Sequence, residues 1–230
     1  MLPIITIDGP ASSGKGTVAK IIAKKLGFHY LDSGAIYRVV GLIALRNNLD
    51  KVNASDDIYV NKILSLLAKV NLEFTDDSVR LDGENVTDLI REEKIGMLAS
   101  KLSSIAALRE YLLGFQRDFA KSPGLVTDGR DMGSVVFPDA TLKIFLTASA
   151  EIRAARRFQQ LQSSGQSATI TAILDDIKAR DRRDSERSVA PLTFDESFKV
   201  LDNSDITIDD TVLQIIKWMK EVFKNSGAGI

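Results

Sequence analysis

The sequence predicts an α/β fold in which helices cover both faces of a mostly parallel, five-stranded sheet, giving three layers. Short apolar runs of strand length recur along the chain, at residues 4–8, 28–31, 125–128, 142–146 and 199–201. Helical patterns separate these runs, and alternating strands and helices are typical of a parallel, doubly wound sheet. The first run also leads into a glycine-rich loop and then a helix, as in many nucleotide-binding α/β proteins.

Two of the helical patterns have recognisable ends. Residues 16–26 lead into Gly27, and glycine favours the left-handed conformation that commonly follows a helix. Near the end of the sequence, residues 209–211 are suited to capping a helix start. The apolar residues that follow them recur at helical spacing: Val212, Ile215, Ile216, Met219, Val222 and Phe223. We therefore expect an amphipathic helix after each of these starts.

Two stretches interrupt the alternation of strands and helices. Residues 70–86, VNLEFTDDSVRLDGENV, alternate around the turn-rich TDDS and DGEN, which predicts a small antiparallel sheet. Residues 151–187 form two charged helical segments joined by SSGQSA. We expect a single domain, 1–230, with a core of residues 1–35, 120–150 and 188–230. Residues 36–119 and 151–187 are excursions from this core, the second forming a helical lid over a ligand.

The bulk composition excludes several classes of protein. The 230 residues carry a net charge of −1, so no overall field favours nucleic acid. The absence of cysteine excludes disulfides, thiolate nucleophiles and cysteine-based zinc sites. No apolar run approaches the roughly 20 residues of a membrane span, and the start lacks the pattern of a secretory signal. We expect a cytoplasmic monomer that needs no membrane or nucleic acid.

A phosphate-binding loop, or P-loop, follows the first predicted strand. Its glycines let backbone N–H groups surround phosphate oxygens at the positive end of a helix, and Lys15 is expected to reach the β- and γ-phosphates. The pattern departs from the minimal motif because Gly16 separates Lys15 from Thr17. Thr17 is therefore either the Mg²⁺ ligand or a contact to the α-phosphate. The predicted ATP-binding residues here are Gly9, Pro10, Ala11, Ser12, Ser13, Gly14, Lys15, Gly16 and Thr17.

Two further motifs indicate a second substrate. DSGAIYR, residues 32–38, opens a helix that Asp32 or Ser33 can cap, with Arg38 in its first turns. In LVTDGRDMGSVVFPDA, Asp128 ends an apolar strand, where a carboxylate can hold Mg²⁺ through water. The following glycine permits a sharp turn that presents Arg130 and Asp131 at the carboxyl edge of the sheet. A local ion pair is the alternative interpretation of these last two residues.

Residues 180–187, RDRRDSER, contain four arginines and three acids. On a helix, Arg180, Arg183, Asp184 and Arg187 would share one face, whereas Asp181 would point elsewhere. Guanidinium groups gathered in this way repel one another until an anion lies between them, which favours phosphate binding over a simple solvated face. Arg153, Arg156 and Arg157 repeat the spacing in the preceding segment, and a solvated face is the expectation for the first two.

These segments together closely resemble the bacterial type of cytidylate kinase, a family of nucleoside monophosphate kinases. The stretches that carry the resemblance, which covers nearly the whole chain, are GPASSGKGT, LDSGAIYR, DGRDMGSVVFPDA and RDRRDSERSVAPL. The resemblance implies a P-loop fold, with ATP and Mg²⁺ as donor and cofactor and CMP or dCMP as acceptor. It makes residues 36–119 the monophosphate-binding region, whose insert is the 70–86 sheet.

The resemblance also implies residue roles. It implies that Ser33, Arg38 and Arg130 bind the phosphate of the acceptor. It also implies that Ser100, Arg109 and Asp131 contact the cytosine edge and that Arg157 contacts ATP. Arg180 and Arg187 would bridge the phosphates, and Asp184 would contact the sugar. The catalytic groups would be Lys15, Arg130, Arg180 and Arg187. From the residues alone, Ser100 and Arg109 would be solvated helix residues.

Two alternatives remain open from the sequence. A kinase of the same fold could act on UMP, AMP or a non-nucleotide acid. A nucleotide-switch protein with little transferase activity is the second alternative, although the sequence has no N-K-x-D run of the kind that reads guanine.

Overall fold

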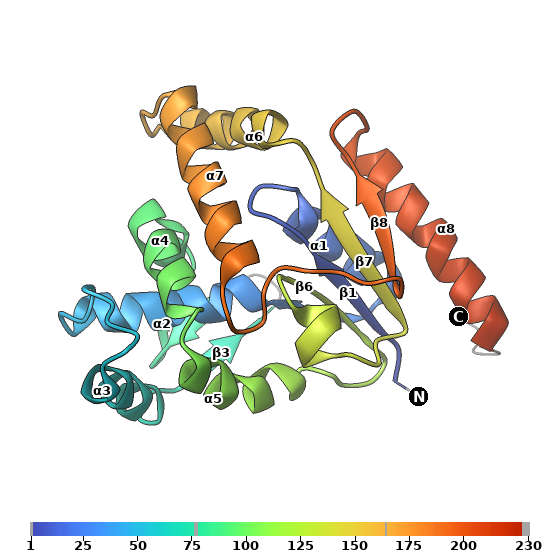
Figure 1. Cartoon of the computed structure of the whole chain (residues 1–230). Helices are drawn as coiled ribbons and strands as arrows, with labels where there is room; N and C mark the ends of the chain where they lie inside the picture. The colour runs from blue at the N-terminus through green and yellow to red at the C-terminus, as the bar shows by residue number, and fades with distance from the viewer. Residues whose placement is uncertain (1, 76–77, 164, 227–230) are drawn as a thin grey trace. The chain divides into compact units, whose positions relative to one another are not determined.

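The computed structural model describes residues 2–75, 78–163 and 165–226. The chain divides into two compact units. We call Met1–Leu31 with Ala120–Ile230 the core unit, and Asp32–Phe119 the helical unit. Figure 1 shows the elements of both in chain order, and each unit is described by itself below.

The core unit is built on the predicted five-stranded sheet, whose order is β2-β6-β1-β7-β8. β1 pairs in parallel with β6 and β7, and β7 pairs in parallel with β8. The bounds of the strands are Ile4–Asp8 (β1), His29–Asp32 (β2), Leu125–Gly129 (β6), Leu142–Thr147 (β7) and Phe198–Asp202 (β8). The α/β fold class with its mostly parallel sheet is confirmed.

Helices α1 (Lys15–Leu26) and α8 (Ile208–Ser226) pack together with the central strands in one apolar core (Figure 1). Ile5 and Ile7 of β1 contribute to this core, so Thr6 and Asp8 point to the opposite face. Gly27 ends α1 in the left-handed conformation, as predicted. The predicted cap of α8 is wrong, because Thr207 accepts from the backbone N–H of Asp210 and the helix begins at Ile208.

The segment predicted to form a lid contains two neighbouring helices of the core unit, α6 (Ala150–Ser163) and α7 (Ile170–Glu186), as Figure 1 shows. They share a small apolar cluster made by Ala154, Leu161, Ile173 and Ile177. Ser164 in the predicted SSGQSA connection lies outside the described residues. The two helical segments predicted for residues 151–187 are thus confirmed.

A short π-helical segment, η2 (Met132–Val136), follows β6 and packs on the face of β1 that carries Thr6 and Asp8. Gly133 is close to that strand, because a Cβ at this position would stand 2.7 Å from Thr6 Oγ1. The tight packing fixes the turn that carries Arg130 and Asp131.

The helical unit contains the predicted antiparallel sheet, with strands β3 (Leu72–Phe74), β4 (Val79–Leu81) and β5 (Glu84–Asn85). Asp82 and Gly83 both have positive φ, as the tight turn between β4 and β5 requires. Residues 76–77 of the predicted TDDS turn lie outside the described residues. The helices are α2 (Ser33–Arg46), α3 (Asp57–Leu67), η1 (Leu89–Arg91), α4 (Glu93–Leu102) and α5 (Ala106–Arg117).

Within the described ranges, no helix is long and apolar enough to cross a membrane.

Candidate functional site

The P-loop follows the carboxyl end of β1 and leads into α1. Only glycine fits at Gly9, because a Cβ there would lie 2.0 Å from the Leu146 backbone oxygen. Gly14, the N-cap of α1, adopts a φ of 88°. This value lies in the left-handed region, which glycine reaches without steric strain. The loop therefore has the backbone of a phosphate cradle at a helix N-terminus.

The loop also carries side chains suited to a phosphate. Lys15 is buried, and its Nζ donates to the backbone oxygen of Pro10 at 3.0 Å. Ser13 is fully buried, and in the described part of the chain its Oγ has no hydrogen-bond partner. A buried hydroxyl without a partner is costly, so a ligand oxygen that accepts from it would lower that cost.

Asp128 lies near the carboxyl end of β6, beside the P-loop. Tyr30 Oη donates to Asp128 Oδ1 at 2.6 Å, which orients the carboxylate. A Cβ at Gly16 would lie 3.6 Å from the same oxygen, and Thr17, which follows Gly16, is exposed at the start of α1. No cluster of three acidic or histidine ligands occurs among the described residues. One oriented carboxylate beside a phosphate loop fits Mg²⁺, which usually keeps several waters and binds phosphates.

Arg130 and Asp184 form a short ion pair between the turn after β6 and helix α7. Arg130 Nε lies 2.7 Å from Asp184 Oδ2, and the two side chains are 17% and 6% exposed. Burial acts to raise the pKa of Asp184, but the charges of Arg130, Arg180 and Arg187 hold it below the usual value. Burial likewise acts to lower the pKa of Arg130, whereas Asp184 raises it. Both groups are therefore charged at neutral pH.

Arg187 and Asp131 form a second, looser contact of this kind. Arg187 Nη2 lies 3.9 Å from Asp131 Oδ1, and both side chains are nearly inaccessible, 5% and 3% exposed. The structure thus brings together five predicted site residues of the core unit. They are Arg130, Asp131, Arg180, Asp184 and Arg187.

The predicted arrangement of residues 180–187 is wrong in two respects. Helix α7 ends at Glu186, so Arg187 is the C-cap with an extended backbone, and its Nε donates to the backbone oxygen of Ala190. Arg183 is exposed although Asp184 is buried, so this arginine does not join the cluster. The carboxylate of Asp131 lies beside Arg187 and offsets part of the positive charge in addition to Asp184, the one carboxylate that the sequence placed on this face.

The expected solvated face for Arg153 and Arg156 is also wrong. Arg153 is 4% exposed, and its Nη1 donates to the backbone oxygen of Ala11 at 3.2 Å. Arg156 donates to the side chain and the backbone of Asn203, at 3.0 and 2.7 Å. Asn203 in turn donates to the backbone oxygen of Ser13 at 3.0 Å. Arg153 therefore contacts the P-loop backbone directly, and Arg156 contacts Asn203, which donates to it. Arg157, also on α6, is half-buried.

In the helical unit, Ser33 and Arg38 lie on α2. Asp32 caps this helix as predicted, accepting from the backbone N–H of Ala35 at 3.0 Å. Ser33 is buried and its hydroxyl donates to Gln116 Oε1 at 3.0 Å. Arg38 Nη1 donates to the backbone oxygen of Ile90 at 2.9 Å. The same guanidinium lies against Gly96 of α4, where a Cβ would stand only 2.9 Å from it.

Ser100 and Arg109 are buried, although the residues alone suggested solvated positions. Arg109 Nη1 donates to the backbone oxygen of Ser103 at 3.0 Å, and its guanidinium lies over the Tyr37 ring, 5.6 Å from the centroid. Ser100 lies one helical turn after Gly96 on α4, on the side that Arg38 contacts. Its buried Oγ lacks a hydrogen-bond partner among the described residues.

The helical unit therefore gathers Arg38, Ser100 and Arg109 around α4, with Ser33 one turn before Tyr37 on α2. Two groups of predicted acceptor-binding residues result, one in each unit.

A further buried carboxylate, Asp8, lies at the end of β1. Its oxygens accept from the backbone N–H groups of Met132 and Gly133 at 2.8 and 2.7 Å, so it holds the start of η2. Burial raises the pKa of Asp8 to about 7, and the charge of Asp131 acts in the same direction. The two backbone hydrogen bonds and the charge of Lys15 act to lower it.

This shift predicts a pH-dependent contribution of Asp8 to stability. In the unfolded chain the carboxyl ionises near pH 4, whereas the folded chain keeps the proton until about pH 7. The contribution to the free energy of unfolding is therefore fully present below pH 4 and is lost as the pH rises to 7. As the pH rises from 4.5 to 7.5, we expect the free energy of unfolding of the wild type to fall by a few kcal/mol relative to that of Asp8→Asn. Urea unfolding of both proteins across this range measures the difference, and a constant difference would contradict the prediction.

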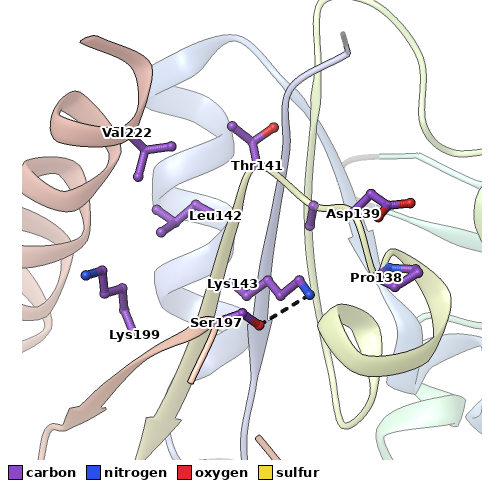
Figure 2. A pocket seen from close by; sticks show the side chains of 9 residues that line it. Pro138, Asp139, Thr141, Leu142, Lys143, Ser197, Lys199 and Val222 are labelled. Atoms are coloured by element: carbon purple, nitrogen blue, oxygen red, sulfur yellow. Dashed lines mark hydrogen bonds between the residues drawn. The ribbon is translucent and has the colours of Figure 1, made fainter. Parts of the chain in front are cut away.

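A shallow hollow of about 490 Å³ lies elsewhere in the core unit (Figure 2). Leu142, Lys143 and Lys199, near the amino ends of β7 and β8, contribute to its lining. The P-loop follows the carboxyl end of β1, which runs parallel to β7, so the hollow is at the opposite edge of the sheet. It is not part of the candidate site.

The sequence analysis missed several residues of the site. Asp8 and Asn203 each occur at or just after the carboxyl end of an otherwise apolar strand, and this position is a usable signal for site residues in α/β folds. Tyr30 in β2 and Arg153 in α6 give no comparable signal, because their contacts depend on packing between distant segments.

The comparisons with known proteins agree with this geometry. Residues 5–221 match the model of the family described as cytidylate kinase. A cytidylate kinase of Nitrosomonas europaea is 49% identical over 97% of this chain and 97% of its own length. One from Chromobacterium violaceum is 51% identical over 96% of each chain.

A solved structure of an uncharacterised protein from Eubacterium ventriosum shares the fold at 13% identity, with a TM-score of 0.54 over 96% of this chain and 99% of that chain. The family match spans the P-loop, both groups of buried arginines and helices α6 and α7. The chain belongs to the cytidylate kinase family.

Proposed function

We propose that this chain transfers the γ-phosphoryl group of ATP to CMP or dCMP, giving ADP and CDP or dCDP. The observation that carries the proposal is the cluster of buried arginines and carboxylates beside a P-loop, in a chain that belongs to the cytidylate kinase family. A P-loop alone occurs in many NTPases. The arginine cluster adds the positive charge and the hydrogen-bond donors that a second, anionic substrate needs.

On the donor side, residues 9–17 surround the phosphates of ATP and Lys15 contacts the β- and γ-phosphates. The Ser13 hydroxyl, which has no hydrogen-bond partner among the described residues, supports a ligand oxygen in the loop. Arg157 of α6 contacts ATP as well. Thr17 and Asp128 would hold Mg²⁺, the carboxylate through water, because the donor set of one oriented carboxylate and one exposed hydroxyl fits that ion. When bound, Mg²⁺ supplies positive charge next to the transferring phosphoryl group.

On the acceptor side, Ser33, Arg38 and Arg130 bind the phosphate of CMP, and Arg180 and Arg187 bridge it to the transferring group. Guanidinium groups favour this role because they form bidentate, charge-assisted hydrogen bonds with phosphate. The buried contacts of Arg38 and Arg130 support it, since both side chains are already held in fixed orientations. Asp184, ionised and oriented by Arg130, accepts from a sugar hydroxyl.

Ser100, Arg109 and Asp131 read the cytosine edge. Cytosine presents an amino donor beside two acceptors, so it requires a carboxylate near N4 and a donor such as arginine near N3 and O2. Uracil reverses the first pair and would set a carbonyl oxygen against Asp131. Two observations support this role: the Ser100 hydroxyl has no hydrogen-bond partner in the described part of the chain, and the Arg109 guanidinium lies over the Tyr37 ring.

No general base is needed for the transfer. The attacking oxygen belongs to an ionised monophosphate and has no proton to lose. Catalysis therefore consists of in-line positioning and of neutralising charge on the transferring group, by Lys15, Arg130, Arg180 and Arg187. The lid also excludes water, which would otherwise accept the phosphoryl group.

Steady-state phosphoryl transfer to CMP, dCMP, UMP and AMP tests the proposal. We expect kcat/KM to be highest for CMP or dCMP. A clear preference for UMP or AMP would contradict the proposed acceptor, and ATP hydrolysis unaffected by any monophosphate would favour a nucleotide switch.

The same assay tests the role of Asp131. Asp131→Asn should raise KM for CMP by roughly 10–100-fold, because a buried hydrogen bond to a charged group contributes about 1.5–3 kcal/mol. KM for ATP should change by less than about threefold on the same reasoning. Asp139→Asn, an exposed change in the same segment, is the control. An equal rise in KM for CMP and for ATP would contradict a role of Asp131 in base selection.

A cytoplasmic location and a monomeric state stay predictions from the sequence.

A further inference from the structure

Arg153 joins three parts of the core unit through one buried guanidinium group. Its Nε donates to the backbone oxygen of Ala148, at the junction of β7 and α6, at 2.9 Å. Its Nη1 donates to the backbone oxygen of Ala11 in the P-loop at 3.2 Å. Both Nη atoms reach the carboxylate of Asp181 on α7, at 3.0 and 2.6 Å. The P-loop and lid helix α7 are thus connected through this side chain.

The contact to Ala11 bears on phosphate binding. When the N–H groups of a phosphate loop point toward the ligand, the carbonyl groups of the same peptides point outward and need donors. Arg153 supplies the donor for Ala11, as Asn203 does for Ser13 and Lys15 for Pro10. A cationic donor on a peptide oxygen also polarises that peptide, which strengthens its N–H as a donor.

The contact to Asp181 bears on the acceptor. Asp181 lies on α7 between Arg180 and Asp184, which are both part of the arginine–carboxylate cluster. A shift of Asp181 would therefore move these two side chains with it, because they share the same turns of helix. The Arg153–Asp181 pair lies at the end of the lid that adjoins the P-loop.

The Arg153–Asp181 pair is one of several contacts between the two lid helices. The helices also share the apolar cluster of Ala154, Leu161, Ile173 and Ile177. A second ion pair between the same helices, Lys178 with Glu151 at 3.7 Å, is exposed at 57% and 66%. The Lys178–Glu151 pair is a matched control because it joins the same two helices, whereas Arg153 of the buried pair also contacts the P-loop.

We propose that Arg153 and Asp181 form a positioning pair that couples the P-loop to the acceptor-binding side chains of α7, so that bound ATP tightens the binding of CMP. This proposal rests on the proposed function. A loop ordered by phosphates fixes the Ala11 carbonyl, which fixes the guanidinium of Arg153 and, through it, Asp181. Coupling of this kind acts equally in both directions, so CMP tightens the binding of ATP by the same factor.

Calorimetric titration of CMP with and without a saturating non-hydrolysable ATP analogue tests the coupling. In the wild type we expect the analogue to tighten CMP binding by roughly tenfold. Asp181→Asn should retain the affinity for CMP alone within about twofold and lose most of this tightening, because a neutral amide holds Arg153 less firmly. Glu151→Gln should keep both values of the wild type.

Arg153→Lys provides a second variant, because a single ammonium group cannot reach all three acceptors of the guanidinium. It should lose the tightening as Asp181→Asn does, and circular dichroism checks that both variants are folded. Coupling of wild-type size in both variants would overturn the proposal, as would a wild type without coupling. A wild type that binds neither CMP nor the analogue would instead overturn the proposed function.

Discussion

Lys15→Met should lower kcat for phosphoryl transfer to CMP by roughly 10²–10⁴-fold, since one preorganised donor removed from a charged transition state costs several kcal/mol. The ammonium group of Lys15 is buried and held by the Pro10 carbonyl within the P-loop, so its position is fixed before the substrate arrives. Methionine keeps most of the length of the side chain and removes the ammonium group, with its charge and its hydrogen bond to Pro10.

The fold should survive this change. A buried ammonium costs free energy to desolvate, which offsets the loss of its hydrogen bond to Pro10, so we expect a melting temperature close to that of the wild type. Lys24→Met, on the exposed face of α1, is the matched control and should retain the activity of the wild type. A Lys15→Met protein with full turnover would exclude Lys15 from catalysis.

Arg187→Ala should have the second largest effect, a loss in kcat of roughly 10²–10³-fold. The side chain is 5% exposed and lies within the cluster that contains Asp131 and Asp184, where it would neutralise charge between the two nucleotides. Because it is buried, we also expect a loss of about 1–3 kcal/mol in the free energy of unfolding from truncation.

Arg183→Ala separates the two effects. Arg183 belongs to the same arginine-rich segment but is exposed, so its replacement should change neither turnover nor stability. If Arg187→Ala lowered the melting temperature and left kcat unchanged, the residue would be structural.

The sequence predicted those parts of the fold and the site that depend on local pattern. The apolar run of residues 4–8, the spacing of the P-loop glycines and the capping by Asp32 follow from backbone requirements that neighbouring residues meet. Helical spacing also placed Arg180 and Asp184 on one face of α7 correctly.

The sequence did not predict burial of charged side chains, because burial depends on contacts between distant segments. Arg153 occurs in a charged helical segment that reads as solvated, yet its partners come from the P-loop and from α7. Arg183 and Arg187 have equivalent spacing on a continued helix, but α7 ends between them and only Arg187 turns inward. The point at which a helix ends is set by local caps and tertiary packing together.

A crystal structure of the chain with CMP and a non-hydrolysable ATP analogue tests the central claim most directly. We expect the guanidinium groups of Arg130, Arg180 and Arg187 within hydrogen-bond distance of phosphate oxygens, and a carboxylate oxygen of Asp131 within about 3 Å of the exocyclic amine of cytosine. Guanidinium groups turned to bulk solvent, with the pyrimidine bound away from Asp131, would contradict the account.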